Sequence, residues 1–232
     1  MGLFDKFKPQ YYKTQQQRKE SSINILKANG VKVFENLPVI ERYEQTTIRT
    51  KDEVVKRTIA ICIVAVYAEG FLTETPIKEN QEFIKPIIER YNAAEFFTEK
   101  EKAFLNNEDP LAQEATNYSW QYECFNVLLW VLNFTAELSF PNGICNVSKL
   151  VNILSSTSNY EQFFDNATLR SKEEIMDQAD LIYRYDWACV DARINDRVVE
   201  NLHPGVVLER HRALNWLVNY MDQDWDNITT DT

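Results

Sequence analysis

The chain has 232 residues, of which 44% are hydrophobic and 26% are charged, and this mixture is typical of one globular domain. Its formal net charge of −10 argues against a nucleic-acid binder, because the phosphate backbone repels so acidic a chain. Only five glycines are present, too few for a glycine-rich phosphate loop, and their scarcity favours helices over sheets.

The first 34 residues predict one helix and one short strand. Residues 1–10 resemble a loose basic and aromatic end, whereas residues 11–29 suit a helix. Apolar and polar side chains alternate over residues 31–34, which predicts a short strand. We expect residues 1–30 to form an extension and a helix that pack on a single helical domain over residues 31–232.

The first strong helix begins after Thr50. Thr50 and Glu53 have the spacing of a capping box, in which each side chain accepts a hydrogen bond from the other residue's backbone N–H. Residues 59–68 are apolar nearly all round, so this helix is predicted to be central and buried. Gly70 is a natural stop for the helix.

The middle of the chain predicts several further helices. Residues 77–92 show a weaker helical pattern that Pro86 is expected to kink or break. A second capping box at Thr98 begins a short helix, and residues 111–134 carry apolar side chains at helical spacing. Another helix is predicted over residues 147–155.

The last third predicts helices over about residues 172–194 and 205–221, followed by a polar tail. Ser171 begins a third capping box, within a string of residues 169–175 that repeats residues 48–54. Two interpretations of this repeat stay open, a weak internal duplication or good N-caps that converged on one string. In total the sequence predicts an irregular all-α domain of about seven helices, with at most one short strand near the N-terminus.

One polar stripe runs along the first of these two C-terminal helices. Asp177, Asp180, Arg184, Trp187 and Asp191 recur at spacings of three and four, so they share one face. Asp180 and Arg184 also form a favourable i,i+4 pair. The stripe is either a solvated face or a set of groove-lining or ion-paired residues, and its aromatic member favours the second interpretation.

The candidate catalytic residues are Asp191, Glu209 and His211. Two carboxylates and an imidazole that meet in space can perform acid–base chemistry or hold a hard metal ion. The opposing interpretation is that His211, which stands next to an arginine, is a hydrogen-bonded structural residue.

The acidic tail gives only a weak metal hypothesis. Asp222, Asp224 and Asp226 stand at alternating positions of a calcium-loop pattern, but Asn227 replaces the glycine that such a loop needs. An EF-hand is therefore excluded. We expect no cofactor, and these three residues are weak candidates for a looser metal site.

A structural network is the third interpretation of the charged residues. Arg49 and Arg170 precede the two matching capping boxes, and Asp226 and Asp231 are expected to cap helix ends or to pair with these arginines. The other candidate members carry charged, amide or indole side chains: Glu53, Glu174, Asp180, Arg184, Trp187, Arg210, Asn215, Trp216 and Trp225.

The sequence also favours the cytoplasm. No segment resembles a secretory signal, and the longest apolar run, residues 59–68, is too short to cross a bilayer. The four cysteines have no C-x-x-C spacing, and Cys62, Cys124 and Cys189 stand among apolar neighbours. We therefore expect a cytoplasmic protein with free thiols and no membrane partner.

Several long strings resemble one family. They are IRTKDEVVKRTIAICIVA, SWQYECFNVLLWVL, FPNGICNVSKLV, LRSKEEIMDQADLIYRYDWACVDAR, VVLERHRALNWLVNY and the terminal DWDNITTDT. Together they resemble the family described as domain of unknown function (DUF) 4272, over roughly residues 30–232. The resemblance implies a bacterial-type, soluble, mostly helical domain and no particular activity. Tyr185-Asp186 stands where many members have a His before Trp187, which argues against a metal or catalytic role that needs that imidazole.

The sequence alone names no reaction, and the leading hypothesis is a soluble cytoplasmic binding or interaction protein. Its acidic and aromatic surface would receive a basic protein partner. The alternative is a hydrolase-like enzyme, metal-dependent or acid–base, that uses Asp191, Glu209 and His211. A pocket on which these three converge favours the enzyme, full pairing in the interior favours the structural network, and an exposed groove favours the partner.

Overall fold

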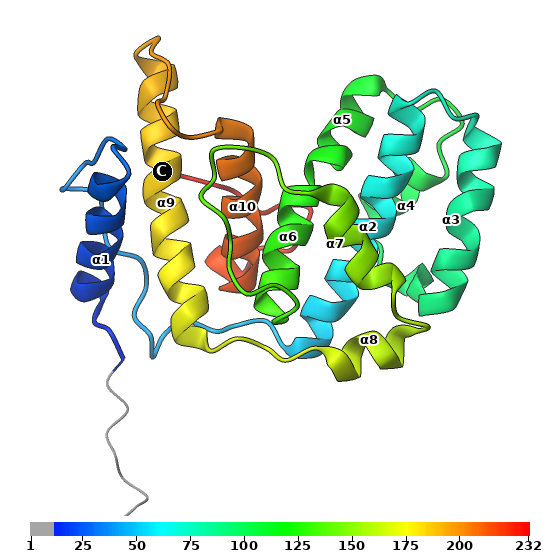
Figure 1. The fold of residues 1–232 in the computed structure, drawn as a ribbon, viewed down its shortest axis with the longest axis horizontal. Helices are drawn as coiled ribbons and strands as arrows, with labels where there is room; N and C mark the ends of the chain where they lie inside the picture. Colours follow the sequence, from blue (N-terminus) through cyan, green and yellow to red (C-terminus); the bar gives the residue numbers. More distant parts are fainter. Residues whose placement is uncertain (1–11) are drawn as a thin grey trace, which may run out of the picture.

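The structure is a computed structural model that describes residues 12–232, and this part of the chain is helical with no strand (Figure 1). The expected all-α class is confirmed, with more helices than the seven or so expected. The prediction for residues 1–10 lies outside the described residues. The α-helices are α1 (Gln15–Ala28), α2 (Lys51–Leu72), α3 (Ile77–Tyr91), α4 (Glu99–Leu105), α5 (Ala112–Trp120), α6 (Tyr122–Val131), α7 (Val147–Ser155), α8 (Tyr160–Asn166), α9 (Lys172–Ile194) and α10 (Pro204–Leu217), with short 3-10 helices η1 (Ala93–Glu95) and η2 (Tyr220–Asp222).

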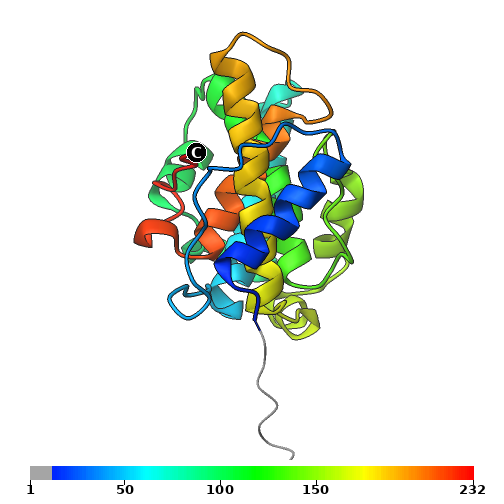
Figure 2. The same cartoon turned by 90° about the vertical axis from the view of Figure 1, so that its left-hand side faces the viewer.

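Six of these helices lie in a row. From one end to the other they are α1, α9, α10, α6, α2 and α3, and each packs on the next (Figure 1). Helix α5 also packs on α2, and α1 crosses α9 obliquely on the outer side (Figure 2). The middle of α2, from Val54 to Ala68, is almost wholly buried, as its apolar sequence predicts.

Several helices begin where the sequence predicts, because the capping residues that start a helix lie close together in the chain. Capping boxes are present at Thr50, Thr98 and Ser171, each with a glutamate three residues later, and they begin α2, α4 and α9. Asn146 likewise caps α7 by accepting a hydrogen bond from the backbone N–H of Lys149.

Two predicted features of the backbone are wrong. The strand expected over residues 31–34 has no partner strand within residues 12–232, and Phe34 instead stacks on Trp187 with ring centroids 5.1 Å apart. Gly70 does not end α2. A Cβ on Gly70 would lie 2.4 Å from Oδ1 of Asn80, so this glycine permits the close approach of α3.

Two other helix boundaries differ from expectation. The helix predicted over residues 111–134 is divided into α5 and α6 at Gln121, where ψ is −4°. Helix α10 ends at Leu217 because Asn219 adopts a left-handed conformation with φ of 51°. Helix α3 continues through Pro86 without a break. No helix within residues 12–232 combines the length and the apolar character that crossing a bilayer would require.

Candidate functional site

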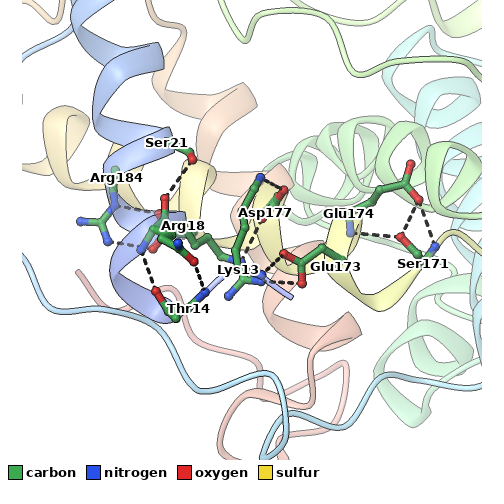
Figure 3. Close-up of polar contacts among 11 residues, drawn as sticks. Lys13, Thr14, Arg18, Ser21, Ser171, Glu173, Glu174, Asp177 and Arg184 are labelled. Atoms are coloured by element: carbon green, nitrogen blue, oxygen red, sulfur yellow. Dashed lines mark hydrogen bonds and ion pairs between the residues drawn. The ribbon is translucent and has the colours of Figure 1, made fainter. Parts of the chain in front are cut away.

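The polar stripe of α9 is covered by the N-terminal part of the chain. Arg18 of α1 is 1% exposed and donates to Asp177 at 3.0 Å and to Glu173 at 2.9 Å (Figure 3). Lys13 adds a second ion pair to Asp177. These contacts attach α1 to α9, while the division of the chain at residue 30 stays a prediction.

The rest of the stripe is covered by the segment that follows α1. Asp180 and Arg184 form a buried ion pair at 2.7 Å, and Arg184 also donates to the carbonyl of Pro38. Trp187 stacks on Phe34, and Lys32 pairs with Asp191 at 2.7 Å. Most of the stripe is therefore a packing face with ion pairs, and Asp191 at its end borders a hollow.

The start of α2 is joined to the end of α10, at what we name the α2 junction. The backbone N–H of Arg49 donates to the carbonyl of Leu217 at 3.0 Å, and its Nε donates to the carbonyl of Trp216 at 3.3 Å. The guanidinium lies over the Trp216 ring, 5.1 Å from its centroid, and donates to Glu53 and to the carbonyl of Gln223.

The start of α9 is joined to the end of α6 in the same way, at the α9 junction. The backbone N–H of Arg170 donates to Val131 and its Nε donates to Trp130, both at 2.8 Å. Its guanidinium lies 4.7 Å from the Trp130 ring centroid and donates to Glu174 and to the carbonyl of Thr135.

The two junctions also share an asparagine after the helix end. Asn219 follows α10 with φ of 51° and donates to the carbonyl of Thr47, while Asn133 follows α6 with φ of 61° and donates to Thr168. Convergence on a good N-cap would explain why both junctions have a Ser or Thr followed by a Glu. It would not explain why a second helix in each junction supplies a tryptophan and then an asparagine. The geometry therefore indicates a repeated unit, with α2 and α6 as the first helix pair and α9 and α10 as the second.

The expected pairing of Asp226 and Asp231 with the two arginines is wrong. Both guanidinium groups are already occupied by backbone carbonyls and by the glutamate of their own capping box. Asp231 accepts a hydrogen bond from Thr229 at 2.8 Å, and Lys100 donates to the carbonyl of Asp226. Trp225 is buried against the edge of Trp216, with ring centroids 5.5 Å apart, and so anchors the tail.

The acidic residues of the tail are not gathered into a metal site. Asp224 accepts hydrogen bonds from the backbone and side chain of Asn227, which closes a turn. Within residues 12–232 no group of three or more His, Cys, Asp or Glu side chains could hold a metal ion, and this includes Asp222 and Asp226.

The three catalytic candidates have separate partners. Asp191 lies on α9 beside Lys32 and Arg197, at a different hollow from His211. The Glu209 carboxyl accepts a hydrogen bond from the thiol of Cys124 at 3.1 Å. Burial raises the pKa of Glu209 above its ordinary value, against the opposing charge of Arg212, whose Nη1 lies 3.9 Å from the Glu209 carboxyl.

Arg210, a predicted network residue, forms a buried pair across helices. Its Nε donates to the Glu123 carboxylate at 3.0 Å, and its Nη1 donates to the carbonyl of Ser139. Glu123 and Glu209 occupy equivalent positions, seven residues before the tryptophans of α6 and α10. One equivalent glutamate therefore has a cation partner at hydrogen-bond distance, whereas the other has a thiol.

His211 is buried, with 1% of its surface exposed, and its Nδ1 lies 3.0 Å from the carboxylate of Asp186 on α9. An ionised carboxylate only accepts hydrogen bonds, so Nδ1 carries a proton, and in the neutral ring Nε2 is then an acceptor. The sequence did not identify Asp186, because 25 residues and a loop separate it from His211.

A pocket of about 230 Å³ opens between α9, α10, the segment before α2 and the C-terminal segment. Its buried floor contains His211, Asn215, Met176 and Ala179. The remaining lining residues form the walls and the exposed rim: Val39, Ile40, Glu41, Thr46, Tyr183, Val218, Tyr220 and Asp231. The pocket therefore brings together three predicted residues, His211, Asn215 and Asp231, with several that the sequence did not single out.

The first helix pair has no such polar floor. Alignment of the junction residues matches His211 to Phe125 and Asn215 to Leu129, and it matches Asp186 to Ala65. The three residues of the first pair are all 0% exposed and belong to the hydrophobic core. Extension of the sequence repeat beyond its first seven residues would have shown Asp186 opposite an alanine, and this signal could have identified it.

Comparison with known proteins identifies a family. The family model described as Domain of unknown function (DUF4272) matches residues 18–228, which is most of the chain. No curated protein and no solved structure matches this chain. The resemblance of the long sequence strings is thereby confirmed, and the chain belongs to the DUF4272 family.

Proposed function

We propose that this protein binds a small molecule in the pocket between α9 and α10. The observation that supports this function best is the difference between the two helix pairs. Where the first pair buries Phe125, Leu129 and Ala65, the second buries a histidine, an asparagine and an aspartate. Buried polar groups cost stability relative to apolar packing, so their presence at one copy favours a functional reason.

The surroundings of the pocket support the same function. In the first helix pair, α8 packs on α2, and Phe163 is fully buried and stacked on Phe134 at 4.7 Å. The corresponding segment before α2, residues 39–46, lines a hollow instead. Concave sites with apolar walls and a few convergent polar groups are typical of ligand pockets.

Two other functions have less support. The enzyme alternative needs Asp191 and Glu209 beside His211, but of these three only His211 lines the pocket. A stable protein partner needs a broad contact surface, whereas a hollow of about 230 Å³ has the size for a small molecule. We therefore place the binding function in the pocket and not on the wider acidic surface.

A nuclear magnetic resonance titration tests the proposal. The full chain, labelled with 15N, is titrated with a mixture of cationic, neutral and anionic fragments, and we expect amide shifts to concentrate on the pocket lining. The double variant Asp186→Ala/His211→Phe introduces the residues of the first pair and should lose these shifts. Leu208→Gln, an exposed change on α10, is the matched control and should keep them. Shifts that persist in the double variant would refute the proposal.

A further inference from the structure

Two polar side chains, His211 and Asn215, offer hydrogen-bond acceptors at the floor of the pocket. In the neutral imidazole, the proton on Nδ1 that faces Asp186 leaves Nε2 of His211 as an acceptor. One side-chain N–H of Asn215 donates to the carbonyl of Thr229 at 2.8 Å, and the Asn215 side-chain oxygen remains available to accept a hydrogen bond from a ligand. No residue within 12–232 donates to either of these two acceptor atoms.

The rim of the pocket is negatively charged. Glu41 and Asp231 come from opposite ends of the chain, and neither forms an ion pair with a Lys or Arg of the described residues. Both lie near Tyr220, whose pKa is raised first by burial and then by the charges of Asp231 and Glu41. The two carboxylates therefore act on the same part of the pocket mouth.

The walls supply apolar and aromatic surface. Val39 and Ile40 offer aliphatic contacts, while Tyr183 and Tyr220 line the opening. The face of an aromatic ring attracts a cation, and this attraction adds to that of the carboxylates. Within residues 12–232, no Lys or Arg side chain lines the pocket.

We propose, on the basis of the binding function above, that the ligand is a small organic cation with N–H donors, such as an amine or an amidine on a compact apolar body. The N–H groups of such a cation match the acceptors of His211 and Asn215, and its charge matches Glu41 and Asp231. An anion would be repelled by the rim, and a neutral ligand without N–H or O–H donors would leave the floor acceptors unpaired.

Calorimetric titration of the full chain with four probes of one shape tests the ligand class. Benzylamine carries both charge and donors, benzyltrimethylammonium carries charge alone, benzyl alcohol is neutral and benzoate is an anion. We expect benzylamine to bind about ten-fold more tightly than benzyl alcohol or benzyltrimethylammonium, because its hydrogen bonds are charge-assisted. Benzoate should show no binding.

Variants of the rim test the role of the carboxylates. Glu41→Gln and Asp231→Asn should each weaken benzylamine binding by about three- to five-fold, as expected for partly exposed ion pairs. Glu44→Gln removes the same charge three residues from Glu41, outside the pocket lining, and should leave the affinity unchanged. Equal effects of Glu41→Gln and Glu44→Gln would contradict a local role for the rim.

Failure of the ligand class can be distinguished from failure of the binding function. Asn215→Leu copies Leu129 and removes one of the two polar side chains of the floor without leaving a buried unpaired charge. If benzyl alcohol or benzoate binds as tightly as benzylamine and Asn215→Leu removes that binding, the pocket is a site but the cation inference is wrong. If no probe and no fragment of any charge binds the parent protein, both proposals are wrong.

Discussion

The buried pair of Asp186 and His211 allows a quantitative test of the comparison between the two helix pairs. Their side chains are 5% and 2% exposed, and their polar atoms lie 3.0 Å apart. His211→Phe leaves a buried carboxylate without its partner, which should cost about 3–5 kcal/mol of unfolding free energy. Asp186→Ala leaves a buried imidazole N–H without an acceptor, at about 1–3 kcal/mol.

The double variant should behave differently from either single variant. Asp186→Ala/His211→Phe reproduces Ala65 and Phe125, a combination that the first helix pair already packs in its core. Replacement of both members of a buried hydrogen-bonded pair by apolar residues of similar total volume can be nearly neutral or stabilising, so the double variant should have an unfolding free energy within about 1 kcal/mol of the parent's or above it. The coupling energy of the cycle should therefore exceed about 3 kcal/mol.

Urea unfolding followed by circular dichroism measures all four proteins, and the slopes of the transitions show whether they share one folded state. Leu208→Phe, an exposed change on the same helix, is the control and should shift stability by less than about 0.5 kcal/mol. Additive losses in the two single variants, within about 0.5 kcal/mol of the double variant, would refute the equivalence of the two helix pairs.

Three further predictions concern the rest of the structure. Arg49→Lys and Arg170→Lys should each lower the unfolding free energy by about 2 kcal/mol in parallel thermal denaturation, because an ammonium group cannot lie on the indole and reach two carbonyls together. Glu123→Gln should cost about 3–5 kcal/mol by breaking a buried pair, whereas Glu209→Gln should leave stability unchanged or raise it at pH 7, as measured by urea unfolding. Arg18→Met should speed amide hydrogen exchange in α1 and leave α2 protected, since Arg18 attaches only α1.

The Glu209 prediction has a defined dependence on pH. Burial raises the pKa of this carboxyl, so the folded state binds its proton more tightly than the unfolded state does. The contribution of Glu209 to the unfolding free energy is therefore fully present below the pKa of an ordinary glutamate. It is lost as the pH rises through the higher pKa of the folded state. The Glu209→Gln variant should lack that part of the decline. A variant that declines as steeply as the parent between pH 4 and pH 7 would contradict the raised pKa.

Helix starts could be predicted from sequence, whereas contacts between helices could not. Thr50 and Ser171 specify their helices through residues three positions away, and this kind of cause is visible in a string of letters. The Arg49 guanidinium also donates to the backbone carbonyls of residues 216 and 223. Every residue has such a carbonyl, so the sequence does not show which ones accept. The expectation that the arginines bind terminal aspartates failed for this reason.

The candidate site was only partly predictable for a related reason. The sequence singled out His211 for its imidazole and Asn215 as a network residue, because the chemistry of a side chain can be read from its letter. Asp186, Glu41 and Tyr220 meet them only through the packing of α9, the segment before α2 and the C-terminal segment. The false strand over residues 31–34 has the same origin, because the alternation there reflects packing on α9 and not pairing with another strand.

The two junctions are alike, whereas the surroundings of the two helix pairs differ. Arg170 holds the segment after α6, where Phe134 stacks on Phe163 and fills the space beside the first helix pair. Arg49 holds the segment after α10 in the same manner, but Tyr220 there borders a hollow. Because the junctions are equivalent, they cannot account for the polar residues of only one pair. The function of this chain is therefore to be sought where the repeat is broken, at the pocket.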